Sequence, residues 1–245
     1  MTGTDPAGQP FLPCKDWTST SFSDSIIIGI STQGPIGWTT AAGSACGDDN
    51  GHGYLGHLDC FGTDLQATVA VEPTDGRKAF VTSGLWTPGG GLAAADAFCA
   101  AEASASHLAG TFAAFLATTA QPASARFDMS PSASRWVRTD GIPVVAQAAD
   151  LVAGDLLAPI AADAAGNYPP LAYYAWTGAQ YPGDLAVLAE NCQDWTVGTS
   201  ASEAWMGEYA ETNADYFSIN AVFGPSTLTF KADCSRQLHL YCLER

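Results

Sequence analysis

The sequence predicts an α+β fold with long loops, and three features lead to this prediction. The first is one strong amphipathic helix early in the larger part of the chain. The second is a set of short apolar runs, typical of strands, most of which come later. The third is an internal repeat of cysteine-containing motifs. Helices and strands that are segregated along a chain are typical of the α+β class.

The strongest helix prediction covers residues 92–103, L-A-A-A-D-A-F-C-A-A-E-A. Alanine has the highest helix propensity, and apolar side chains recur here at the spacing of one helix face. We expect the helix to end near residues 107–110, where Gly110 suits a C-cap. A second, shorter helix is expected around residues 146–151. The side chains expected on the buried face of the first helix are Leu92, Ala95, Phe98, Cys99 and Ala103.

Short apolar runs between turn residues predict the strands. The segment E-P-T-D-G at residues 72–76 has the composition of a linker. The expected strands are residues 25–30, 67–71, 77–83, 111–116, 173–176, 218–223 and 238–242.

A segment near the N-terminus recurs near the C-terminus. The matches are C-K-D-W-T at residues 14–18 with C-Q-D-W-T at 192–196, Cys46 with Cys234, and H-L-D-C at 57–60 with H-L-Y-C at 239–242. We therefore expect a complete module at residues 78–245. It is preceded by a linker at residues 63–77 and by a partial module, the C-terminal half of a second copy, at residues 1–62.

The charge of the chain excludes several classes of partner. It carries 25 acidic residues against nine Lys plus Arg, a net charge of −16. Such a chain repels phosphate backbones and anionic surfaces, so no binding of nucleic acid or heparin is expected. No run of about eighteen apolar residues is present, which argues against membrane insertion.

The seven cysteines predict disulfides and an oxidising compartment. They stand at repeated positions, and neither a C-x-x-C pair nor zinc-finger spacing is present. We therefore expect an extracellular or cell-surface protein. Met1–Pro6 lacks the features of a signal peptide, which suggests a mature form or an excised piece.

Several blocks of the sequence resemble the endostatin-type domain, a variant of the C-type-lectin-like fold. The resemblance is nearest to uncharacterised secreted bacterial relatives. It covers residues 79–244 as a whole domain and residues 2–62 as its second half. The blocks are A-F-V-T-S at residues 79–83, the helix start at 89–99, L-A-G-T-F-A-A-F-L at 108–116, W-T-G at 176–178, Cys192 and L-Y-C at 240–242.

The resemblance implies the disulfides Cys99–Cys242 and Cys192–Cys234, and the repeat adds Cys14–Cys46. Cys60 is the copy of Cys242, so it is expected to be an unpaired thiol or to bond to another chain. The half-module is expected to belong to a longer tandem array, to dock on residues 78–245, or to self-associate with a second chain.

The metal and cofactor properties of related families do not transfer. Animal endostatins carry an arginine-rich heparin face and a zinc-binding histidine cluster, and this chain has neither. The calcium motifs of sugar-binding lectins are also missing, so we expect no cofactor. The remaining candidates for a calcium site are Asp48, Asp49, Asn50 and His52, with Asp59 as a distant acid; the alternative is a solvated turn.

No catalytic group is predicted. The chain has no G-x-S-x-G motif, and nothing in the sequence selects one acidic pair from its 25 acids. His57 and His239 take equivalent repeat positions and are interpreted as structural. A candidate ligand face is formed by Trp205, Tyr209, Tyr216 and Phe217, with core packing as the alternative.

These observations favour a secreted or cell-surface, non-catalytic binding or adhesion module that recognises a protein or a glycan through its loop face. Since one fold hosts many functions, two alternatives stay open. One is a hydrolase that uses an acidic pair. The other is a structural stalk or matrix protein built from tandem repeats.

Overall fold

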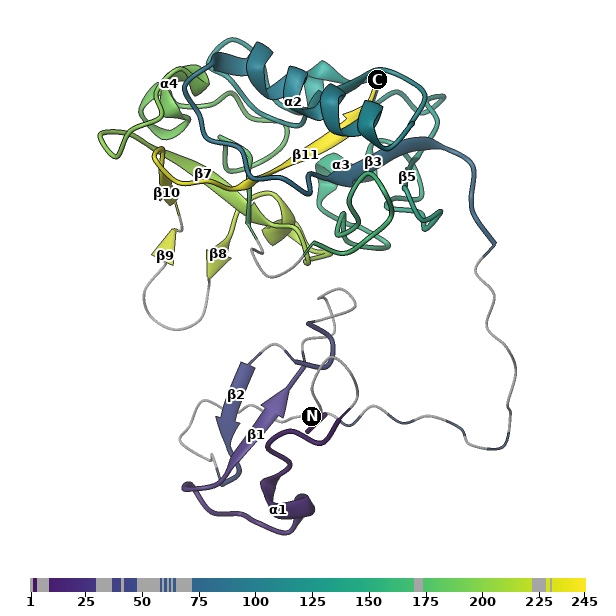
Figure 1. Ribbon diagram of the computed structural model, residues 1–245, viewed down its shortest axis with the longest axis vertical. Coiled ribbons are helices and arrows are strands. Elements are labelled where there is room, and N and C mark those ends of the chain that lie inside the picture. Colours follow the sequence, from purple (N-terminus) through teal and green to yellow (C-terminus); the bar gives the residue numbers. More distant parts are fainter. Residues whose placement is uncertain are drawn as a thin grey trace. The chain divides into compact units, whose positions relative to one another are not determined.

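A computed structural model describes residues 2–3, 9–29, 37–40, 42–47, 58, 60, 62, 64, 72–169, 174–221, 228–229 and 231–245. The chain divides into two compact units, unit 1 (Met1–Ala70) and unit 2 (Val71–Arg245), as Figure 1 shows. Among the described residues, no helix is both long and apolar enough to span a bilayer.

Unit 2 is an α+β domain built around its last strand, β11 (His239–Glu244). On one side β11 pairs antiparallel with β3 (Arg77–Val81). On the other side it pairs first in parallel with β6 (Tyr174–Trp176) and then antiparallel with β4 (Phe112–Ala114). Segments far apart in the sequence therefore meet on one central strand.

The sheet extends outward in the order β10-β7-β6-β11-β3-β5. The strand β7 (Glu203–Glu208) pairs antiparallel with β6, and β10 (Lys231–Asp233) pairs antiparallel with β7. At the opposite edge, β5 (Trp136–Arg138) runs parallel to β3. A separate two-stranded ladder joins β8 (Asn220–Ala221) to β9 (Leu228–Thr229).

Helix α2 (Gly91–Ala105) covers one face of this sheet, where Figure 1 shows it lying over β11. Ala95, Cys99 and Ala103 are buried against Leu240 and Cys242, so the predicted helix face is confirmed. Burial of this apolar stripe holds the helix on the sheet.

The C-terminus of α2 differs from the prediction. The helix ends with His107 in the left-handed region (φ 57°), and the N–H of Leu108 donates to the carbonyl of Ala103 at 2.9 Å. This is a Schellman arrangement in which a histidine takes the position that glycine usually fills. Gly110 instead allows a close approach to Glu244, because a Cβ at this position would lie 2.4 Å from the Glu244 carboxylate.

The other face of the sheet carries a second core, covered by loops and short helices. Its largest buried side chains are Trp136, Tyr216, Tyr241, Phe115 and Phe217. The short helices are α3 (Asp150–Ala153), which begins later than the expected helix at 146–151, and the 3₁₀ turns η1 (Ser124–Arg126), η2 (Leu188–Glu190) and η3 (Ala214–Tyr216).

Unit 1 has the same framework as the second half of unit 2. Its strands β1 (Ser25–Ile28) and β2 (Ala42–Ala45) pair antiparallel as β7 and β10 do. The turn α1 (Cys14–Trp17) precedes β1 as α4 (Cys192–Trp195) precedes β7. The N–H of Cys46 donates to Asp24, and that of Cys234 donates to Ser202, both at 2.9 Å. The sequence repeat is thus also a structural repeat.

Both α1 and α4 are single left-handed turns. Lys15 and Asp16 have φ/ψ of 51°/58° and 54°/43°, and Gln193 and Asp194 have 52°/61° and 53°/41°. Left-handed helical backbone costs roughly 1–2 kcal/mol for each L-residue. In unit 2 the turn carries Cys192 and Trp195 at its two ends, and both side chains are buried there.

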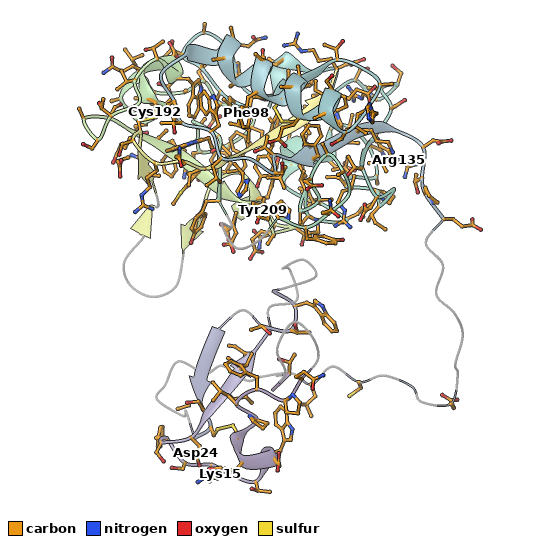
Figure 2. All side chains as sticks on the ribbon, in the orientation of Figure 1. Lys15, Asp24, Phe98, Arg135, Cys192 and Tyr209 are labelled. Atoms are coloured by element: carbon orange, nitrogen blue, oxygen red, sulfur yellow. A yellow bond between two sulfur atoms is a disulfide. The ribbon has the colours of Figure 1, made fainter. Side chains whose placement is uncertain are left out.

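Three disulfides are present: Cys14–Cys46, Cys99–Cys242 and Cys192–Cys234. These are the pairs that the resemblance and the repeat imply. Cys60 carries a free, exposed thiol. In unit 1, Lys15 Nζ lies 2.9 Å from Asp24 Oδ2. Figure 2 labels both residues among the side chains of the chain.

Candidate functional site

The prediction of an aromatic ligand face is wrong. Trp205, Tyr209, Tyr216 and Phe217 are each only 1–7% exposed, so they are core side chains. The hydroxyl of Tyr216 donates to the carbonyl of Leu151, and the hydroxyl of Tyr241 donates to the carbonyl of Tyr216 at 2.6 Å. The core-packing alternative explains these aromatics, because no ligand can reach side chains so deeply buried.

The calcium candidates Asp48, Asp49, Asn50, His52 and Asp59 lie outside the described residues. Within the described part of the chain, no group of three or more His, Cys, Asp or Glu side chains is arranged to hold a metal ion.

His239 has the surroundings of a structural histidine. Its Nδ1 lies 2.6 Å from the carbonyl oxygen of Thr82, and its ring packs edge-on against Tyr209 at 5.4 Å. Burial lowers the pKa of the imidazole, which favours the neutral ring. The Nε2 atom is buried and has no hydrogen-bond partner among the described residues. His57, its repeat equivalent, lies outside the described residues.

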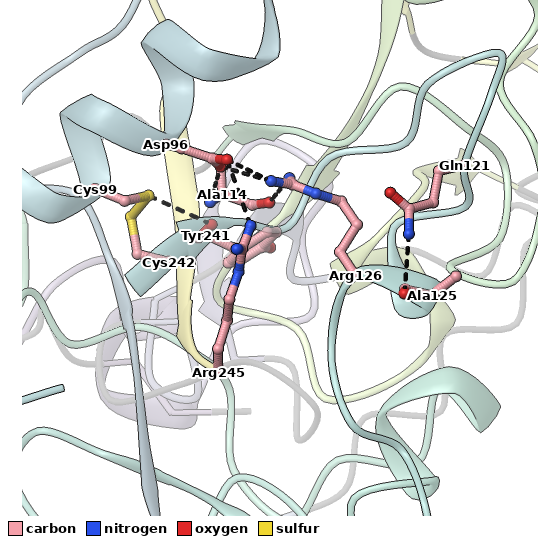
Figure 3. A network of polar contacts seen from close by, with 9 residues as sticks. All are labelled: Asp96, Cys99, Ala114, Gln121, Ala125, Arg126, Tyr241, Cys242 and Arg245. Atoms are coloured by element: carbon pink, nitrogen blue, oxygen red, sulfur yellow. Dashed lines mark hydrogen bonds and ion pairs between the residues drawn. A yellow bond between two sulfur atoms is a disulfide. The ribbon is translucent and has the colours of Figure 1, made fainter. Parts of the chain in front are cut away.

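A buried ion pair joins α2 to the segment after β4 (Figure 3). Both carboxylate oxygens of Asp96 accept from the Arg126 guanidinium, at 2.7 and 2.6 Å, and Oδ1 also accepts from the N–H of Ala114 at 2.9 Å. Arg245 lies 3.5 Å from the same carboxylate. Because the Arg126 side chain is almost wholly buried, this network anchors the helix and is not an open site.

One loop of unit 2 presents an apolar surface to solvent. We call residues 179–190 the recognition loop. It follows the strand β6 and ends in η2. Its exposed apolar side chains, each from 50% to 59% exposed, are Tyr181, Leu185, Val187 and Leu188. Exposed apolar side chains gathered on one short segment are a candidate contact surface.

The recognition loop is fixed to the domain at several points. Ala179 and Ala186 are buried, and the N–H of Ala186 donates to the carbonyl of Thr118 at 3.0 Å. The N–H of Ser124 donates to the carbonyl of Pro182 at 2.9 Å. These bonds fix the loop backbone to the domain, and a segment that is already ordered loses less entropy in any binding event.

The end of the loop is held by charged and aromatic groups. Glu190 accepts from Lys231 Nζ and, at 3.0 Å, from the indole N–H of Trp205. Hydrogen bonding to Lys231 and Trp205 lowers the pKa of Glu190 despite its partial burial, so this carboxylate stays ionised and paired. The ammonium of Lys231 also lies 4.9 Å from the Trp205 ring.

A second group of interest is an acidic cluster formed by Glu208, Glu211 and Asp215. Glu208 stands at the end of β7, opposite Tyr174 in the strand register. Burial, together with the charges of Glu211 and Asp215, raises the pKa of Glu208 to about 7. Glu211 is buried and accepts from Asn213 Nδ2 at 3.1 Å. A carboxyl that titrates near neutral pH can hold or release a proton there.

Neither the recognition loop nor the acidic cluster was predicted from the sequence. A signal for the recognition loop does exist, because Tyr181, Leu185, Val187 and Leu188 crowd a short segment that also contains the turn residues P-G-D at 182–184. The acidic cluster leaves no comparable signal, since its members are three of 25 acids and only burial sets Glu208 apart.

In comparisons with known proteins, no protein-family model matches this chain and no curated protein matches it.

Proposed function

We propose that unit 2 is a non-catalytic binding module that recognises a protein partner through the recognition loop. The observation that supports this most directly is the combination of four half-exposed apolar side chains with a fixed loop backbone. Apolar anchors on a pre-ordered segment contribute binding free energy at low entropic cost.

We further propose that the module has the endostatin type of C-type-lectin-like fold and works outside the cell or at its surface. Support comes from the mixed sheet covered by one main helix and from the disulfide that joins that helix to the last strand. Three disulfides are typical of proteins from oxidising compartments. A net charge of −16 favours a neutral or basic partner surface.

Photo-crosslinking tests the proposed contact surface. A photoreactive amino acid replaces Leu185 in the full chain, which is then presented to intact cells and extracellular matrix. The matched control carries the same group at Ala101, an exposed position on α2. We expect crosslinks from position 185. An excess of unlabelled chain should compete them away, and substitution of Tyr181, Val187 and Leu188 by serine should remove them.

Equal crosslinking from position 101 would overturn the proposal. So would binding on a glycan array that survives the serine substitutions, since recognition would then be of carbohydrate and through another surface.

A hydrolase remains the second candidate, because the acidic cluster supplies a carboxyl with a pKa near 7 beside two further acids. A panel of ester, peptide and glycoside substrates tests this function. Activity that the full chain shows and the Glu208→Gln variant lacks would establish catalysis and displace the binding-module proposal.

A further inference from the structure

Trp17 and Trp195 occupy the same place in the two units but differ sharply in exposure. Each ring packs on one side against a glycine. A Cβ at Gly3 would lie 2.8 Å from the Trp17 ring, and a Cβ at Gly178 would lie 2.5 Å from the Trp195 ring. Yet Trp17 is 50% exposed and Trp195 is 0% exposed. The difference therefore lies in what covers the other side of each ring.

In unit 2 most of that cover comes from one segment, residues 86–119, which includes α2; the ring of Trp176 adds to it, 6.0 Å from that of Trp195. The indole N–H of Trp195 donates to the carbonyl of Ala117 at 2.9 Å, and the Trp195 carbonyl accepts from the N–H of Gly89 at 2.8 Å. The ring of Trp86 lies 6.0 Å from that of Trp195.

The preceding acid has partners in the same segment. The carboxylate of Asp194 accepts from the N–H and the hydroxyl of Thr119. In unit 1, by contrast, neither the indole N–H of Trp17 nor the carboxylate of Asp16 has a hydrogen-bond partner among the described residues. Unit 1 thus contains the tryptophan and the acid of this contact, and the groups that meet them are described only in unit 2.

We propose that the Trp17 face of unit 1 binds a polypeptide segment from outside residues 1–245 that is built like residues 78–119. In this segment, strand β3, helix α2 and strand β4 follow one another in unit 2. Its counterpart would give a carbonyl acceptor to the Trp17 indole, and a main-chain N–H with a hydroxyl to Asp16. The α2 of this chain is not that occupant, because it is buried in unit 2 and bonded through Cys99 to Cys242.

Cys60 supplies a chemical marker for the docked segment. It holds the repeat position of Cys242, which bonds to Cys99 of α2, and its own thiol is free and exposed. A helix cysteine in the docked segment is then placed to bond with Cys60. The two thiols join as a disulfide while oxidised glutathione accepts two electrons and two protons and leaves as two molecules of reduced glutathione.

The test mixes the full chain with a separately made polypeptide of residues 78–119 in a glutathione buffer. Peptide mapping by mass spectrometry measures how fast Cys60 bonds to the Cys99 of the added segment. We expect a rate about tenfold or more above that of a shuffled segment with its cysteine at the same position. Trp17→Arg is expected to abolish this advantage, and Ser23→Arg, an exposed control in unit 1, to preserve it.

A fusion removes the dependence on folding of the free segment. Residues 78–176 are placed directly ahead of Thr2, which is the repeat equivalent of Thr177. The fusion therefore has the same junction as Trp176–Thr177 in unit 2. The Trp17 indole N–H, assigned in a nitrogen–proton NMR spectrum by its loss in Trp17→Phe, is expected to exchange with solvent at least about tenfold more slowly than in the unfused chain.

An unchanged exchange rate in the fusion would overturn the proposal, as would a shuffled segment that reacts with Cys60 as fast as the native one.

Discussion

The carboxylate of Asp194 accepts two hydrogen bonds from Thr119, one from its main-chain N–H at 2.8 Å and one from its hydroxyl at 2.6 Å. These bonds join the left-handed turn α4 to the segment that follows β4. Together with Asn191, Thr119 lowers the pKa of Asp194 although burial acts to raise it. The equivalent acid of unit 1, Asp16, makes no such bonds within the described part of the chain.

We therefore expect Asp194→Ala to lower the free energy of unfolding of unit 2 by about 2 kcal/mol, the usual range for hydrogen bonds to an ionised group. Asp16→Ala is the matched control, because both acids occupy the same left-handed backbone and lose the same conformational preference. Urea denaturation of the full chain measures both. Equal losses in the two variants would contradict a special role for Thr119.

His107→Gly is expected to stabilise unit 2 by about 1 kcal/mol, because glycine adopts the left-handed conformation at the end of α2 without the cost that histidine bears. Ser104→Gly, in the last turn of the same helix, is expected to destabilise by roughly 0.5–1 kcal/mol. Thermal unfolding distinguishes the two variants. A lower melting temperature for His107→Gly would show that the histidine side chain contributes more than its backbone strain costs.

Asp96→Asn is expected to cost about 3–5 kcal/mol, since it leaves the buried guanidinium of Arg126 without its carboxylate. Asp155→Asn, at an exposed position, is the control and is expected to change stability by less than about 0.5 kcal/mol. A loss at Asp96 as small as at Asp155 would mean that Arg126 finds another partner.

The pH dependence of stability reports on Glu208. Its pKa is about 7 in the folded chain against an ordinary 4.5, so the folded state binds this proton more tightly than the unfolded state. The resulting stabilisation is complete below pH 4.5 and is lost as the pH rises through about 7, with about 3 kcal/mol as an upper limit.

Denaturation of unit 2 between pH 5 and pH 8, measured about one pH unit apart, tests the predicted slope of the free energy of unfolding against pH. Glu208→Gln is expected to flatten it and to be more stable than the parent chain at pH 8. Glu203→Gln, at the other end of β7, is expected to keep it. A slope that persists in Glu208→Gln would assign the titration to another group.

Much of the fold was accessible from the sequence because local patterns agreed with tertiary structure. The spacing of Ala95, Cys99 and Ala103 predicted the buried face of α2, and the runs at residues 25–30 and 77–83 contain β1 and β3. The strand expected at residues 67–71 lies outside the described residues.

The strand β7 was missed, although it pairs with both β6 and β10. Its sequence, E-A-W-M-G-E, is poor in β-branched residues, so propensity gave no indication of a strand. The repeat did contain the signal, because Glu203 follows Cys192 at the same spacing as Ser25 follows Cys14. In the same alignment Trp205 is equivalent to Ile27, which lies in the strand β1. Trp205 is therefore expected in a strand and not at the tip of a loop.

The candidate site was less accessible, because exposure depends on which apolar side chains the rest of the fold leaves uncovered. Tyr209 and Tyr181 are the same residue type in similarly polar surroundings, yet one is buried and the other half exposed. They differ because Tyr209 packs into the core that contains Tyr241 and Leu243 of β11, whereas Tyr181 is not part of it.

The central place of β11 also sets an order of events during biosynthesis. Its partners β3, β4 and β6 leave the ribosome long before it does, and none of them can complete its ladder until residues 239–244 emerge. Until then Cys99 cannot form its disulfide, because Cys242 lies 143 residues further along the chain. A nascent chain of this kind leaves apolar surface uncovered in the meantime, because pairings between distant segments form slowly.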